Sequence, residues 1–201
     1  MQKFSHTDQV LSLAHQKGLI RSNDLNDAGI PRAYLTRLVQ AGRLEKTGRG
    51  IYQLPDKPLT ENAGMEILAT KVPQAVFCLL TALQYHGLTT QLPKQVWIAM
   101  PQGSHPPKID YPPIKMIQCA PKHFVEGMEI HRRNEHEFKV YSVARTIADC
   151  FKHRNKIGLD VALEALRAAL AQKKVNANDL WHFAKIDRVT NVMRPYLEAL
   201  T

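Results

Sequence analysis

The sequence predicts an α+β fold in two parts. The first part is small and helical and ends in a β-hairpin, and the second has helices around a small, mainly antiparallel sheet and a helical C-terminal part. Three observations predict this fold. Apolar residues recur at helical spacing over the first forty residues, two extended runs flank a glycine-rich link near residue 48, and extended runs between residues 95 and 141 give way to helical spacing from residue 142. We expect domains at residues 1–55 and 59–201, because the proline-containing segment between them breaks secondary structure.

The first two helices are predicted from their ends. Ser5 can cap a first helix, Asp8 supports its positive end, and Gly18 ends it. Ser22 is expected to cap a short second helix, which stops at Gly29. The buried side of the first helix is expected to contain Val10, Leu11, Leu13 and Ala14.

A third helix is predicted from Pro31 to about Gln40, with Gly42 after it. Its apolar side contains Ile30, Tyr34, Leu35, Leu38 and Val39. Its opposite, mainly polar side contains Arg32, Ala33, Thr36, Arg37 and Gln40. The third helix is therefore strongly amphipathic.

Two short extended runs follow the third helix, at residues 43–46 and 51–54. The link between them contains two glycines, which suits a tight hairpin. Three helices followed by a hairpin, with a glycine in the turn between the second and third helices, is the layout of a winged helix-turn-helix. In that motif the third helix enters the major groove of DNA.

The residue types on the two exposed elements suit DNA. Arginine can pair with guanine, glutamine with adenine, and threonine with the backbone or a thymine methyl group. The hairpin residues Arg43, Lys46 and Arg49 can reach phosphates or the minor groove. The alternative is a winged helix that contacts another protein, with Arg32 and Arg37 simply solvated.

The second part is expected to alternate helices and strands. Helices are predicted from Thr60 to Lys71 and from Gln74 to Tyr85, the second of them stopped by Gly87. Strands are predicted at residues 95–100, 114–119, 128–132 and 137–141, with a proline-rich loop at 102–113. Further helices are predicted at residues 143–152, capped by Ser142, at 159–172, from 178, and at 189–200.

Composition restricts the class of protein. The chain has 201 residues, of which 44% are hydrophobic and 22% are charged, as in a globular protein. No stretch approaches about 18 uncharged apolar residues, and the N-terminus lacks the apolar run of a secretory signal. The three cysteines Cys78, Cys119 and Cys150 form neither a CxxC pair nor a disulfide framework. We expect a cytoplasmic protein with reduced, buried thiols and no membrane partner.

The net charge of +9 is concentrated at the two ends of the chain. Residues 1–55 contain 8 Lys and Arg against 4 Asp and Glu, and residues 141–201 contain 10 against 6. Excess positive charge attracts polyanions, either nucleic acid or an anionic membrane, and does not by itself choose between them.

Several segments in order resemble one known family. They are AGIP at 28–31, YLTRLV at 34–39, GRLE at 42–45 and GRGIYQLP at 48–55, then CLLTAL at 78–83, HGLT at 86–89, VWIA at 96–99 and YSVARTIAD at 141–149. In this order they are similar to the AbiEi-type antitoxins. The resemblance implies a transcriptional autoregulator that binds inverted repeats in its own promoter. It also implies an antitoxin for a nucleotidyltransferase-like toxin encoded by a neighbouring gene.

Histidines and charged pairs are the candidates for a site of chemistry. His131 and His136 offer only two of the three or four ligands that zinc needs, so they are interpreted as polar residues of a hairpin. Arg145 and Asp149, four apart on one helix, are expected to pair with each other. His86 lies at a helix end, where the dipole favours it.

Two features leave other functions open. Glu137 and Lys139 share a strand face in a pattern that some nucleases use, although no suitable preceding aspartate supports it. A basic cluster near the C-terminus is interpreted as a solvated face, a set of phosphate contacts or a surface for an acidic toxin; it contains Lys152, His153, Arg154, Lys156, Arg167, Lys173 and Lys174.

The sequence therefore predicts a DNA-binding autoregulator that acts as two copies on an inverted repeat and is not an enzyme. No phosphate-binding loop, dinucleotide motif, nucleophile elbow or HExxH is present, so neither catalytic residues, a cofactor nor a metal is expected. The alternatives are a solitary winged-helix regulator without a toxin, a DNA nuclease that uses its second domain, and a module that neutralises a toxin by direct contact.

Overall fold

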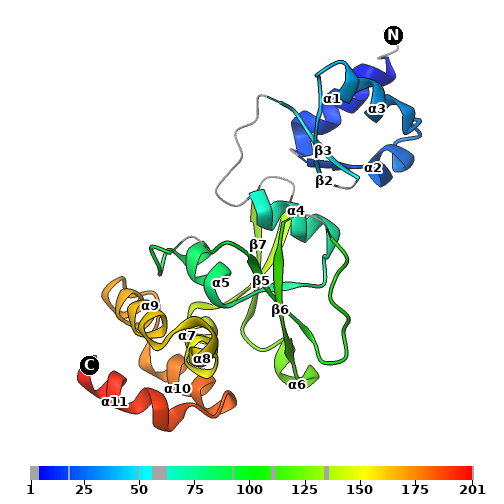
Figure 1. Cartoon of the computed structure of the whole chain (residues 1–201). Coiled ribbons are helices and arrows are strands. Elements are labelled where there is room, and N and C mark those ends of the chain that lie inside the picture. Colours follow the sequence, from blue (N-terminus) through cyan, green and yellow to red (C-terminus); the bar gives the residue numbers. More distant parts are fainter. Residues whose placement is uncertain are drawn as a thin grey trace. The chain divides into compact units, whose positions relative to one another are not determined.

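The computed structural model divides into two compact units (Figure 1). It describes residues 5–17, 19–48, 50–55, 63–91, 93–109, 112–133 and 136–200. The first unit contains Met1–Pro73 with the short segments Pro107–Pro112 and Arg132–Phe138, and the second contains the rest of the chain. The predicted boundary at residues 54–58 lies mostly outside the described residues, so it stays a prediction.

The first unit contains the predicted helices and hairpin. Its elements are α1 (His6–Lys17), β1 (Leu19–Arg21), α2 (Ser22–Asp27), α3 (Ala33–Gln40), β2 (Glu45–Gly48), β3 (Ile51–Gln53) and α4 (Ala63–Lys71). The strand β1 was not predicted. It pairs antiparallel with β3, so the small sheet has the order β1-β3-β2. Three residues are too few to show the alternation that marks a strand in sequence.

The ends of the first helices agree with the sequence except at α2. Ser5 caps α1 as predicted, because its Oγ accepts the backbone N–H of Asp8 at 3.2 Å. The prediction that Ser22 caps α2 is wrong, since Arg21 is the N-cap and Ser22 is already helical. Arg21 ends β1 in extended conformation, and its backbone N–H donates to Asp24 Oδ2 at 2.6 Å. Gly18 lies outside the described residues.

The third helix begins two residues later than predicted. Its first turn is tight, because the N–H groups of Tyr34 and Leu35 donate to the carbonyls of Pro31 and Arg32. Gly29 and Gly42 flank the segment with φ of +68° and +66°, which glycine adopts without strain.

Besides a smaller group of Leu19, Ile51 and Ile67, the first unit has a larger apolar cluster. Its buried members are Val10, Ala14, Ile20, Leu25, Ile30, Leu35, Leu38 and Leu44. Every helix from α1 to α3 and the strand β1 contribute to it. The predicted apolar sides of α1 and α3 therefore face this core, with Tyr34 and Val39 at its edge.

The elements that follow α4 form a five-stranded sheet and a group of helices (Figure 1). In chain order the elements are β4 (Val76–Phe77), α5 (Leu79–His86), β5 (Val96–Pro101), β6 (Ile114–Cys119), α6 (Pro121–Phe124), β7 (Met128–Arg133), β8 (His136–Tyr141), α7 (Val143–Lys152), α8 (Arg154–Ile157), α9 (Leu159–Ala171), α10 (Ala177–Ile186) and α11 (Thr190–Leu200). The α+β fold class is thus confirmed, and the short helices α6 and α8 were not predicted.

The larger sheet is mixed rather than mainly antiparallel. Its order is β6-β5-β4-β8-β7, and β4 runs antiparallel to β5 but parallel to β8. Strands β5 and β6 are also parallel, in register from Val96 opposite Ile114. The proline-rich segment 102–113 is long enough for this arrangement, because a parallel pair needs a crossover of about a dozen residues.

The helix predicted from Gln74 to Tyr85 is wrong in its first part. Val76 and Phe77 form β4 instead, where Phe77 lies opposite Ile98 on one side and Val140 on the other. The helix α5 begins only at Leu79 and ends at Gly87, whose φ is +66°. An apolar run buried on both sides looks alike in a strand and in a buried helix, so sequence periodicity does not separate them.

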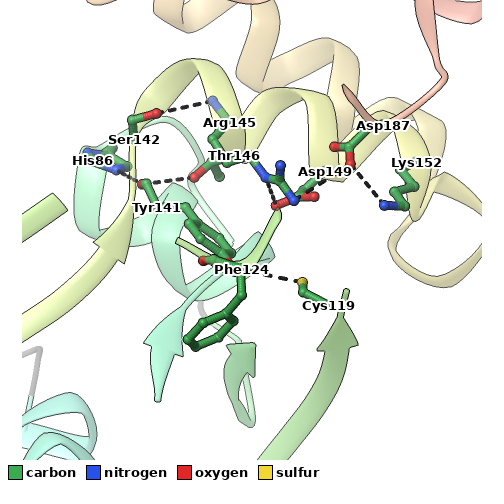
Figure 2. A network of polar contacts seen from close by, with 10 residues as sticks. All are labelled: His86, Cys119, Phe124, Tyr141, Ser142, Arg145, Thr146, Asp149, Lys152 and Asp187. Atoms are coloured by element: carbon green, nitrogen blue, oxygen red, sulfur yellow. Dashed lines mark hydrogen bonds and ion pairs between the residues drawn. The ribbon is translucent and has the colours of Figure 1, made fainter. Parts of the chain in front are cut away.

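A buried ion network joins the C-terminal helices. Arg145 and Asp149 on α7 are each 1% exposed, and Arg145 Nε donates to Asp149 Oδ2 at 3.0 Å. Asp187, after α10, lies 3.6 Å from Arg145 Nη2 and accepts from Lys152 Nζ at 2.9 Å. Figure 2 shows these side chains beside Tyr141, whose ring lies 5.2 Å from the Arg145 guanidinium carbon. The predicted pairing of Arg145 with Asp149 is confirmed.

The network gives a pH dependence that can be measured. Burial, and then the negative charge of Asp187, raise the pKa of Asp149 from 3.8 to about 8, against the lowering effect of Arg145. Between those values the folded chain holds a proton that the unfolded chain releases, so this group's contribution to stability falls as pH rises. Asp149→Asn, which cannot titrate, is expected to gain stability relative to the wild type from pH 5 to pH 8, by at most about 1.4 kcal/mol per pH unit. Thermal unfolding of both proteins across this range tests it, and a difference that does not change with pH would contradict it.

Candidate nucleic-acid interface

The polar side of α3 is open to solvent. Burial of Leu35 and Leu38 in the core turns the opposite side of the helix outward, because α-helical residues repeat every 3.6 positions. All five residues predicted to face DNA here are exposed; they are Arg32, Ala33, Thr36, Arg37 and Gln40. The structure therefore brings together on one side of α3 the residues that the sequence assigned to base contacts.

Arg32 is held by two asparagines of α2. Its Nε donates to Asn26 Oδ1 and its Nη2 donates to Asn23 Oδ1, each at 3.1 Å. These asparagines were not predicted as part of the site. The only signal for them in the sequence is slight, namely two amide side chains three apart and therefore on one side of a helix.

Arg37 has a different support. Its guanidinium carbon lies 5.6 Å from the centroid of the Tyr34 ring, within the range of a cation–π contact. The Tyr34 ring in turn meets the His6 ring of α1 edge-on, with centroids 5.2 Å apart. Tyr34 thus links the core side of α3 to one of the cations on its exposed side.

The β2–β3 hairpin, which follows α3 in the chain, adds positive charge. Lys46 on β2 lies opposite Tyr52 and is exposed, and Arg43 is exposed in the turn that precedes β2. Arg49, predicted to be at the hairpin tip, lies outside the described residues. The exposed acids Asp27 and Glu45 lie on α2 and β2, so this surface is basic without being free of carboxylates.

The buried carboxylate of Asp24 connects α2 to the residues that precede it in the chain. It is 7% exposed and accepts both the backbone N–H of Arg21, at 2.6 Å, and Lys17 Nζ, at 3.1 Å. These contacts tie the end of α1 and the start of α2 to one carboxylate. The position of α2, and hence of its two asparagines, depends on this carboxylate.

Two of the other candidate residues lie beside oppositely charged or polar neighbours. His131 lies 3.1 Å from a Glu129 carboxylate oxygen, and the His136 side chain lies outside what the structure describes. Among the described residues no group of three or more His, Cys, Asp or Glu is placed to hold a metal ion. Glu137 lies 3.5 Å from Arg132 in an exposed ion pair.

His86 ends α5, as predicted, and is turned inward. Its Nε2 lies 2.7 Å from the carbonyl oxygen of Tyr141, so Nε2 carries the proton and donates (Figure 2). Burial is the main cause that lowers the pKa of His86, which keeps the ring neutral near pH 7. The side chain therefore joins α5 to the end of β8.

The C-terminal basic cluster is partly used within the fold. Lys152 pairs with Asp187, Arg154 Nη1 donates to the Phe151 carbonyl at 2.9 Å, and Lys174 Nζ donates to the His86 carbonyl. Lys156, Arg167 and Lys173 are exposed. The three predicted buried cysteines are indeed buried and free.

The N-terminal segment matches a known family. Residues 8–55 match the model of the family described as "Transcriptional regulator, AbiEi antitoxin", which covers α1 to β3 and about a quarter of the chain. The resemblance is thereby confirmed over this segment, and so is its winged-helix fold. No curated protein matches the chain. No helix in the described ranges is long and apolar enough to cross a membrane.

The role of Asp24 can be tested by its removal. Asp24→Ala is expected to destabilise the first unit by about 1.5–3 kcal/mol, because two donors lose a buried charged acceptor. Amide hydrogen exchange in α1 to α3 measures the change. The matched variant Asp27→Ala removes an exposed carboxylate of the same helix and should change stability by no more than about 0.5 kcal/mol. Equal effects of the two substitutions would contradict the assignment.

Proposed function

We propose that this protein is a sequence-specific DNA-binding transcriptional autoregulator, and an antitoxin that counters a nucleotidyltransferase-like toxin. One observation carries the first half of the proposal. The exposed side of α3 presents Arg32, Thr36, Arg37 and Gln40 in a segment that matches a transcriptional-regulator family.

DNA binding follows from the chemistry of the two exposed elements. A helix fits the major groove, and each arginine there can form a bidentate pair with guanine O6 and N7 while Gln40 can pair with adenine. Arg43, Lys46 and Arg49 approach the phosphates or the minor groove, where they add affinity without reading sequence. One winged helix reads a short site, so two copies bind an inverted repeat in the promoter of the protein's own gene.

The antitoxin half rests on the family match. The domain of residues 59–201 is then the antitoxin or effector domain, and the toxin is encoded by a neighbouring gene. The exposed cations Lys156, Arg167 and Lys173 offer a surface for an acidic partner. This function acts in the cytoplasm and requires no catalytic residue, metal or cofactor.

Three substitutions separate base reading from phosphate contact. Arg37→Ala is expected to weaken binding to promoter DNA by about 1–3 kcal/mol with little change in nonspecific binding. Lys46→Ala and Arg49→Ala should each weaken binding to every sequence and reduce the salt slope by about one unit. Mobility shifts on the DNA upstream of the protein's own gene, with nonspecific competitor and a salt series, measure both quantities.

The matched control is Arg194→Ala, which removes an exposed arginine from α11 and should leave DNA binding unchanged. If competitor removes all binding by the wild type, or if the Arg37, Lys46 and Arg49 variants all bind like the wild type, the proposal is wrong. Co-expression with the neighbouring gene tests the antitoxin half. Arg37→Ala should still protect cells from that gene product, because the proposed effector domain is elsewhere in the chain.

A further inference from the structure

We propose that Asn23 and Asn26 hold the Arg32 guanidinium by one edge, so that its remaining edge is presented to a guanine in the major groove. The two asparagines would then be positioning residues for base recognition. This inference deepens the DNA-binding function proposed above and rests on it.

The hydrogen bonds use one particular edge of the guanidinium. Nε–H and the neighbouring N–H of Nη2 form the side edge of the fork, and these are the donors that Asn26 and Asn23 engage at 3.1 Å. The end edge, formed by Nη1 and the second N–H of Nη2, points away from the side edge. In the part of the chain that the structure describes, no acceptor is recorded for this end edge.

The end edge has the geometry that guanine requires. Two parallel N–H donors match the O6 and N7 acceptors, which only guanine presents side by side in the major groove. Adenine has a donor next to N7 and would repel one of the two N–H groups. Arg32 directly precedes α3, and the residues at the start of a recognition helix are those that contact base edges.

The chemistry of the holding groups supports a ligand-binding role over a structural one. Asparagine is neutral, so these two hydrogen bonds do not neutralise the Arg32 positive charge, which can attract an anionic or electron-rich partner. All three side chains are exposed, and exposed hydrogen bonds of this kind contribute little to stability. Their effect is to reduce the rotamer freedom that a long arginine side chain would otherwise lose on binding.

The same edge could instead donate its N–H groups to a DNA phosphate. The test below distinguishes a guanine partner from a phosphate partner. The probe is a fluorescent duplex selected by the wild-type protein from a random-sequence library. In a series of copies, one guanine at a time is replaced by 7-deazaguanine, which lacks the N7 acceptor. Dissociation constants are measured for the wild type, for Arg32→Ala, and for the double variant Asn23→Ala with Asn26→Ala.

A specific pattern is expected. At one guanine in each half-site, the wild type loses affinity by about fivefold or more on 7-deaza substitution, whereas Arg32→Ala loses nothing further. The double asparagine variant binds the unmodified probe about three- to tenfold more weakly, and its 7-deaza effect at that guanine shrinks. Its salt slope stays that of the wild type, because no charge has been removed.

Other results overturn the inference. Arg32 binds a phosphate if two results occur together. The loss of affinity on 7-deazaguanine substitution is then the same for the wild type and for Arg32→Ala at every position, and Arg32→Ala has a lower salt slope. A full 7-deaza effect in the double asparagine variant shows that the asparagines do not position Arg32. If no sequence is enriched from the library, the proposed function and this inference both fail, whereas enrichment with Arg32-independent effects overturns the inference alone.

Two controls guard against a general loss of structure. Gln16→Ala removes an exposed amide from α1 and should bind the unmodified and modified probes like the wild type. Thermal unfolding of the double asparagine variant should match that of the wild type, because both amides are exposed. A folded variant with altered sensitivity to the guanine N7 is a result that a purely structural role would not give.

Discussion

Burial of Leu35 and Leu38 is the constraint on which the proposed DNA interface depends. In the first unit, α3 contributes these two leucines to the larger apolar cluster. A helix with two such side chains buried has little freedom to rotate about its axis, because rotation would expose them and open a void. The direction of Arg37 and Gln40 is therefore set by core packing rather than by any contact that these residues make with each other.

Elements marked by local signals were predictable from the sequence, and elements defined by pairing were not. The α3 helix, the β2–β3 hairpin and the Ser142 cap of α7 each have a cap, a glycine or a clear periodicity within a few residues. The strands β1 and β4 are three and two residues long. Their strand character comes from partners distant in sequence, so no local pattern marks it.

The candidate site divides in the same way. Helical spacing alone places Arg32 and Thr36 on the solvent side of α3. The contacts of Arg32 with Asn23 and Asn26 were missed, because they depend on the path of the chain between α2 and α3. Likewise the spacing of Arg145 and Asp149 predicted their pairing, whereas Asp187 follows α10 and no sequence rule connects it to them.

Arg145 and Arg32 show that the groups bound to a guanidinium decide whether it is free to bind a ligand. Arg145 is buried against Asp149 and Asp187, so its guanidinium is engaged within the fold and holds α7 against the chain after α10. Arg32 is hydrogen-bonded by neutral amides in solvent, so its charge and the end edge of its guanidinium stay unused by these contacts. A carboxylate in place of either asparagine would orient Arg32 equally well and cancel the attraction to DNA. The choice of amides therefore makes sense for a side chain that must be held still and remain attractive to an anion.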